Sequence, residues 1–188
     1  MMLVAKRQVG IVPFARRLGI VRVLGAPRME PSLHSITYRK TRQAALRSIA
    51  DSSLNLVFIH WNVPHLPAIY DATNDEFSND SARTYVDNLR LVDRTVRELR
   101  LTLEGAGLWD SSTILMTADH PLRLGPGSDK QTSEVPYMLK MAGQKQGIAY
   151  TAAMQTVVTK DLLLAIMKGD IARPEQVAVW LDHNPPHR

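Results

Sequence analysis

The sequence of 188 residues contains no cysteine. This absence excludes disulfide bonds, thiolate nucleophiles and cysteine-based zinc or iron–sulfur sites, so a metal ion would have to be held by His, Asp or Glu. Long uncharged apolar runs are also absent, and the mean hydropathy is −0.15. We therefore expect no membrane span, and the hydrophobic content of 45% is sufficient for one globular core.

Acidic residues are almost absent from the first 50 positions. This segment holds ten Lys or Arg residues and one acid, Glu30, for a net charge of +9, whereas residues 51–188 carry a net charge of −4. A basic segment can attract nucleic acid or anionic lipid. Its aromatic residues are only Phe14 and Tyr38, which is too few for a stacking platform. A solvated basic leader is therefore favoured over a nucleic-acid interface.

Glycine and proline interrupt the apolar stretches of residues 3–31, which predicts extended or irregular chain there. Residues 9–15 form a short apolar run after two basic residues, as in a signal peptide. Two arginines end that run, and no small-residue cleavage site comes before the next Arg. We therefore predict no signal peptide, and the localisation stays unknown. Residues 39–51 predict a short helix.

The rest of the chain alternates between strand and helix patterns. Strands are predicted at 54–60, 112–117 and 135–141, a long helix at 80–104, a helix capped by Thr159 that ends at Gly169, and a short helix that begins near Pro174 and ends near Trp180 and Leu181. This alternation predicts an α/β fold built as a layered α/β/α sheet. Ligands of such sheets gather beyond the carboxyl ends of the strands.

The long helix carries the clearest periodicity. Its apolar residues recur at steps of four and three, which predicts that Leu89, Val96 and Leu99 are buried against the sheet. Asn79 or Asp80 is expected to cap its first turn.

Polar side chains follow two of the predicted strands. His65 lies in a proline-containing loop after strand 54–60, and Asp119 and His120 follow strand 112–117. A carboxylate and an imidazole are suitable ligands for a divalent cation. The alternative is that this pair only forms hydrogen bonds with the backbone. His60, at the end of its strand, is expected in the core or in a supporting role.

The order of these motifs resembles the sulfatase family of the alkaline phosphatase superfamily. The motifs are Pro64-His65-Leu66-Pro67, a helix with Tyr85 and Asp93, Gly107-Leu108-Trp109-Asp110, and Thr117-Ala118-Asp119-His120, within residues 54–141. The resemblance implies a metal-dependent hydrolase of sulfate or phosphate esters, with Asp119 and His120 as metal ligands. The implied metal is calcium, with zinc or manganese as alternatives. His65 would lie near the ester oxygens, and Lys130 would neutralise an anionic substrate.

The sequence departs from the family pattern in two ways. Pro121 stands where family members have Gly after the metal-binding pair. No Asp precedes Asp51, so the Asp-Asp metal motif of the family's N-terminal half is absent, as is its Cys or Ser nucleophile. We therefore predict the C-terminal part of a sulfatase domain. We expect three parts in the chain. Residues 1–50 form a basic, irregular N-terminal segment with a short helix, residues 51–183 form the partial domain, and residues 184–188 form a tail.

Three functional interpretations stay open. The chain can be part of an ester hydrolase that is inactive alone and needs the missing N-terminal half as its partner. It can be a catalytically silent metal-binding or interaction module, or it can bind nucleic acid through the basic arm. The first interpretation is favoured because it accounts for the motif order, whereas the third accounts only for the arm.

Overall fold

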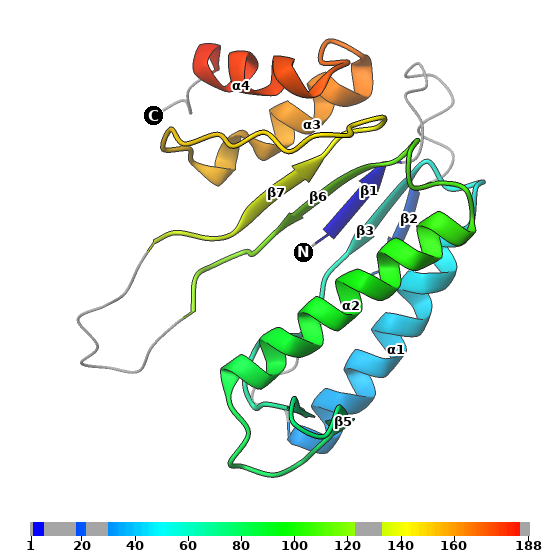
Figure 1. Ribbon diagram of the computed structural model, residues 1–188, viewed down its shortest axis with the longest axis vertical. Helices are drawn as coiled ribbons and strands as arrows, with labels where there is room; N and C mark the ends of the chain where they lie inside the picture. Colours follow the sequence, from blue (N-terminus) through cyan, green and yellow to red (C-terminus); the bar gives the residue numbers. More distant parts are fainter. Residues whose placement is uncertain (1, 6–17, 22–29, 123–132, 185–188) are drawn as a thin grey trace.

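The computed structural model describes residues 2–5, 18–21, 30–122 and 133–184. In these parts of the chain, a five-stranded sheet lies between two pairs of helices (Figure 1). The sheet contains β1 Met2–Ala5, β2 Leu18–Val21, β3 Leu56–Ile59, β6 Thr113–Thr117 and β7 Tyr137–Lys140, and a separate ribbon contains β4 Tyr70–Asp71 and β5 Glu76–Phe77. The helices are α1 Pro31–Ala50, α2 Tyr85–Gly105, α3 Thr159–Lys168 after a 3-10 turn at Thr156–Val158, and α4 Pro174–His183.

The strand order places β1 in the middle of the sheet, in the sequence β2-β3-β1-β6-β7. β1 pairs antiparallel with both β3 and β6, so that Met2 lies opposite Ile59 on one side and Met116 on the other. The outer pairs are β2 with β3, which are parallel, and β6 with β7, which are antiparallel. Because β1 is antiparallel to both neighbours, β3 and β6 run in the same direction and end at the same edge.

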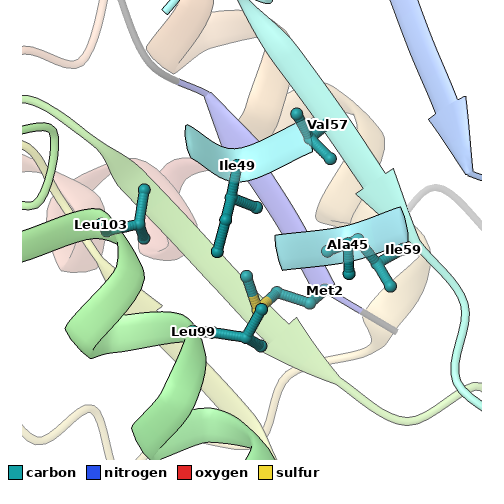
Figure 2. Close-up of a cluster of buried hydrophobic side chains, with 7 residues drawn as sticks. All are labelled: Met2, Ala45, Ile49, Val57, Ile59, Leu99 and Leu103. Carbon is teal, nitrogen blue, oxygen red and sulfur yellow. The ribbon is translucent and has the colours of Figure 1, made fainter. Parts of the chain in front are cut away.

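The main core lies between the sheet and the helices α1 and α2 (Figure 2). Its buried side chains come from β1, α1, β3 and α2, and they are Met2, Ala45, Ile49, Val57, Ile59, Leu99 and Leu103. A second cluster joins α3 and α4 to β7, where Leu139 packs against a group of buried residues that includes Leu162 and Ile166. Because alternate strand residues point to opposite faces, Leu139 and the core residue Ile114 lie on different sides of the sheet. The predicted α/β/α layering is therefore confirmed.

The first 50 residues contribute more to the fold than their composition indicated. β1 and β2 lie in the segment expected to be irregular, and α1 begins at Pro31, earlier than the predicted helix 39–51. Pro31 fits the first helical turn because its fixed φ suits the helix and its missing N–H has no acceptor there. Met2, Ala45 and Ile49 are core residues. The interpretation as a solvated leader is thus wrong for the described part of this segment, and the boundary at residue 51 stays a prediction.

The other predicted elements are present with slightly shifted ends. β3, β6 and β7 occupy the three predicted strands, and α4 begins at Pro174 as expected. Thr159 is the first residue of α3 and does not cap it, while Gly169 ends the helix with a φ of 87°. No helix in the described part of the chain combines the length and the apolar character that crossing a bilayer requires.

Helix α2 differs from its prediction in both its start and its buried face. Its cap is Thr84, since Asp80 instead accepts hydrogen bonds in the loop from Ala82 and Arg83. The buried face consists of Asn88, Leu91, Thr95, Leu99 and Leu103. Leu99 was predicted correctly, but Leu89 is 41% exposed and Val96 is half-buried. The reason is that α2 turns a partly polar face toward α1, where the hydroxyls of Tyr38 and Thr95 lie 2.6 Å apart.

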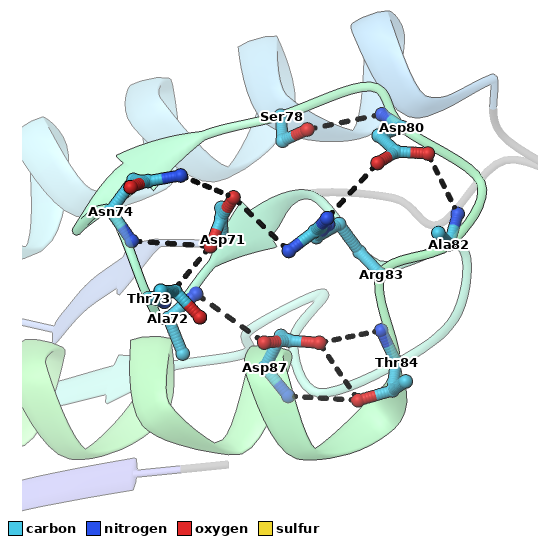
Figure 3. A network of polar contacts seen from close by, with 10 residues as sticks. All are labelled: Asp71, Ala72, Thr73, Asn74, Ser78, Asp80, Ala82, Arg83, Thr84 and Asp87. Atoms are coloured by element: carbon cyan, nitrogen blue, oxygen red, sulfur yellow. Dashed lines mark hydrogen bonds and ion pairs between the residues drawn. The ribbon is translucent and has the colours of Figure 1, made fainter.

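A polar network in the loop before α2 is centred on Asp71 (Figure 3). Asp71 accepts hydrogen bonds from the backbone amides of Thr73 at 2.9 Å and Asn74 at 3.2 Å, and it pairs with Arg83 at 3.1 Å. Burial raises the pKa of Asp71, but these donors together lower it below its usual value. The carboxylate is therefore ionised at neutral pH, and the network holds the loop against the start of α2.

The core assignment predicts a large effect for Leu99→Ala. Leu99 is 2% exposed, so we expect the free energy of unfolding to fall by about 2–5 kcal/mol, because the shortened side chain leaves a cavity in the core. The matched control is Leu101→Ala, on the same helix but 55% exposed, which should change it by less than about 0.5 kcal/mol. Urea unfolding measures both. Equal losses in the two variants would contradict the assignment.

Candidate functional site

Three of the predicted site residues come together beyond the carboxyl ends of β3 and β6. His65 lies in the loop after β3, and Asp119 and His120 lie just after β6. All three line one cavity, together with His60. The ring centroids of His65 and His120 are 5.2 Å apart, with 70° between the ring planes. The fourth predicted residue, Lys130, lies outside the described residues.

The loop that carries His65 is fixed by α2. Asn88, which is completely buried, donates from Nδ2 to the carbonyl oxygen of His65 at 2.8 Å. Its Oδ1 atom accepts a hydrogen bond from the amide of Ile69 at 3.0 Å. One α2 side chain thus fastens both ends of the segment from His65 to Ile69.

The same loop is also fixed by α1, through the buried ring of His34. Its Nδ1 atom lies 2.8 Å from the carbonyl oxygen of Pro67, and its Nε2 atom lies 2.9 Å from that of Asn62. Carbonyl oxygens only accept, so both contacts are hydrogen bonds only when both ring nitrogens carry a hydrogen. The Asn62 side chain donates back to the carbonyl oxygen of His34 at 3.0 Å. His34 therefore has a structural role in the site, although its sequence context gave no indication of one.

The electrostatics of the site centre on Asp119. Partial burial raises the pKa of its carboxyl, whereas its own backbone amide and the nearby His120 and His60 lower it, and the net shift is downward. Asp119 is therefore ionised at neutral pH. The Nδ1 atom of His120 lies 2.8 Å from the carbonyl oxygen of Pro121, so Nδ1 is the donor. In the neutral ring, this arrangement leaves the lone pair on Nε2, which can act as a ligand or an acceptor.

The residues present do not form a complete metal site. Within the part of the chain that the structure describes, no group of three or more His, Asp or Glu side chains could hold a metal ion. Asp119 and His120 supply one carboxylate and one imidazole, while zinc sites in proteins have three or four protein ligands and calcium sites have six to eight oxygens. Asp119 and His120 could therefore supply only part of the coordination shell of a metal ion.

The cavity beside these residues has a volume of about 570 Å³ and is mainly apolar. One wall is α2, where Leu89, Val92 and Val96 face the cavity, and Met116 and Met138 of the sheet lie opposite. The stripe that was predicted to be buried against the sheet is thus largely a cavity wall. Tyr85, from the motif that resembles the sulfatase family, also lines the cavity, whereas Asp93 is exposed.

The motif Gly107-Leu108-Trp109-Asp110 has a packing role. The Nζ atom of Lys140 on β7 donates to the carbonyl oxygens of Trp109 at 2.6 Å and Ser112 at 2.9 Å. Lys140 also lies 4.8 Å from the centroid of the Trp109 ring, and burial lowers the pKa of its ammonium group. The motif therefore ties the start of β6 to the end of β7.

Comparison with known proteins identifies one family. The family model described as Sulfatase matches residues 40–168, which is more than half of the chain and includes His65, Asp119 and His120. No curated protein and no solved structure matches the chain. The match agrees with the resemblance inferred from the motif order.

The residues that position the loop were not predicted from the sequence, and Asn88 provides the clearest test of their role. Asn88→Ala should lower the free energy of unfolding by about 1–3 kcal/mol, because the Ile69 amide and the His65 carbonyl lose a buried partner. It should also shift the NMR signals of the His65 ring. The control Asn184→Ala removes an exposed side chain that donates to the carbonyl of Trp180. An unchanged His65 spectrum in a destabilised Asn88→Ala protein would show that Asn88 does not position His65.

Proposed function

Because this chain belongs to the sulfatase family, we propose that it binds sulfate or phosphate esters at the site formed by His65, Asp119 and His120. The observation that supports this proposal most is the parallel direction of β3 and β6. It brings two imidazoles within 5.2 Å of each other, at the edge of the sheet where α/β proteins bind ligands. His65 then acts as an N–H donor to the ester oxygens, while Nε2 of His120 is left to coordinate a cation.

A divalent ion belongs to the same proposal, because sulfatases generally use one. Asp119 and His120 are its proposed ligands, with calcium as the first candidate and zinc or manganese as alternatives. Two ligands give weak binding, so most of the coordination shell would come from water or from another part of a sulfatase domain.

Turnover also needs a nucleophile, and the sequence has no cysteine and no serine in the family's nucleophile motif. We therefore propose that this chain does not hydrolyse esters by itself and that it needs the nucleophile-bearing half of such a domain as its partner. A catalytically silent metal-binding module is the alternative function. The lack of the family's nucleophile motif in the sequence favours that alternative.

The metal proposal predicts weak binding that depends on Asp119. Titration calorimetry with calcium, magnesium, manganese and zinc should detect a site that is lost in Asp119→Ala. The control Asp161→Ala removes an exposed carboxylate on α3, away from this cavity, and should leave binding unchanged. Equal binding by wild type and Asp119→Ala would contradict the assignment.

The ester proposal predicts binding without turnover. With added calcium, zinc or manganese, the chain alone should not hydrolyse p-nitrophenyl sulfate or p-nitrophenyl phosphate, because the sequence lacks the family's nucleophile motif. Inorganic sulfate should still bind, and His65→Ala should weaken it about tenfold through the loss of one hydrogen bond to a charged group. The exposed His183 provides the control variant, His183→Ala. Metal-dependent turnover that disappears in both His65→Ala and Asp119→Ala would show that the chain is a complete enzyme.

A further inference from the structure

The cavity between α2 and the sheet has the size and position of a small-molecule site. Its volume of about 570 Å³ lies within the range of ligand pockets in proteins. His65, Asp119 and His120 line it. A molecule whose charged group reaches these residues therefore has room to place the rest of its body against α2.

The part of the cavity away from these residues is apolar. Its walls include the α2 residues Leu89, Val92 and Val96, and the sheet residues Met116 and Met138. Leu89 is 41% exposed and Met138 is 51% exposed, although both are large apolar side chains. Covering such side chains with an apolar group removes their surface from water and is favourable.

Polar groups that could recognise hydroxyl groups are scarce on the α2 wall. Its polar side chains in the cavity are Tyr85 and Thr95. The Thr95 hydroxyl already donates to the carbonyl of Leu91 at 2.6 Å and contacts the hydroxyl of Tyr38 at 2.6 Å. The other polar lining residues lie outside α2, and they include His60, Thr117 and Glu134. A sugar lying against the α2 wall would lose its hydrogen bonds to water and gain few in return, which is unfavourable.

We infer that this site selects esters of apolar alcohols, with an aryl or alkyl body against α2 and the sheet and the sulfate or phosphate group at His65 and His120. Carbohydrate esters should bind less tightly, because the α2 wall offers their hydroxyl groups few hydrogen-bond partners. The inference deepens the proposed function and rests on it for the position of the charged group. The binding of an apolar group in the cavity does not depend on the proposed anion site.

The experiment measures binding with four probes, by titration calorimetry and by the fluorescence of Trp61, which lines the cavity. The probes are 2-naphthyl sulfate, methyl sulfate, glucose 6-sulfate and 2-naphthol. We expect 2-naphthyl sulfate to bind at least tenfold more tightly than methyl sulfate and glucose 6-sulfate. Leu89→Asn should weaken 2-naphthyl sulfate several-fold and leave methyl sulfate unchanged. The control is Leu101→Asn, on the same helix at a 55% exposed position that does not line the cavity.

A second variant, Val92→Thr, is close in shape to the wild type and adds one hydroxyl to the wall, so it should weaken 2-naphthyl sulfate several-fold and leave methyl sulfate unchanged. The inference is overturned by equal affinities for the three sulfates, by no binding of any naphthyl probe, or by naphthyl binding that is insensitive to both variants. Binding of 2-naphthol that is weakened by Leu89→Asn but not by His65→Ala supports the apolar cavity. If 2-naphthyl sulfate then binds no more tightly than 2-naphthol, the result contradicts the proposed anion site but supports the apolar cavity as a binding site.

Discussion

The pairing of β1 with both β3 and β6 determines where the site forms. β1 contributes four residues, and each pairs with β3 on one side and β6 on the other. Since both pairings are antiparallel, β3 and β6 run in the same direction, and the segments that follow them leave the sheet at the same edge. Direct antiparallel pairing of β3 with β6 would instead place His65 and Asp119 at opposite edges. Met2 is also 4% exposed and lines the cavity, so this strand forms part of the core and part of the site.

Helix α2 shows why an apolar stripe does not identify the buried face of a helix. The apolar residues Leu89, Val92 and Val96 line a cavity, whereas the buried face of the helix combines three leucines with the polar residues Asn88 and Thr95. These two polar residues are buried at little cost because each has hydrogen-bond partners. Periodicity reveals that a stripe is apolar. It does not reveal whether protein or a ligand covers that stripe.

The sequence predicted those parts of the fold whose signals are local. β3, β6 and β7 are apolar runs between turn residues, and α3 and α4 have clear ends at Gly169 and Pro174. β1 and β2 were missed, because strands of four residues next to basic and glycine-containing segments become stable only through pairing with distant strands.

The site residues also divide into those with a local sequence signal and those that depend on distant contacts. His65, Asp119 and His120 could be placed because they follow strands, and the end of a strand can be identified from a short stretch of sequence. His34 and Asn88 could not, since they act through hydrogen bonds to residues 19 to 33 positions away. A buried Asn within a helical apolar pattern is the one sequence signal that could have indicated such a role.

The motifs that match the sulfatase family therefore fall into two kinds, those that pack the fold and those that belong to the proposed site. The motif around Trp109 records packing, because Lys140 fastens its carbonyl oxygen to β7. Asp119 and His120 are the proposed metal ligands, and the lowered pKa of Asp119 keeps its carboxylate ionised at neutral pH. A sulfate or phosphate group beside it meets like charge, and only a cation or donating imidazoles can offset that repulsion. Motif order can thus persist in a chain whose fold is intact, whereas the proposed ester binding depends on the balance of charge around Asp119.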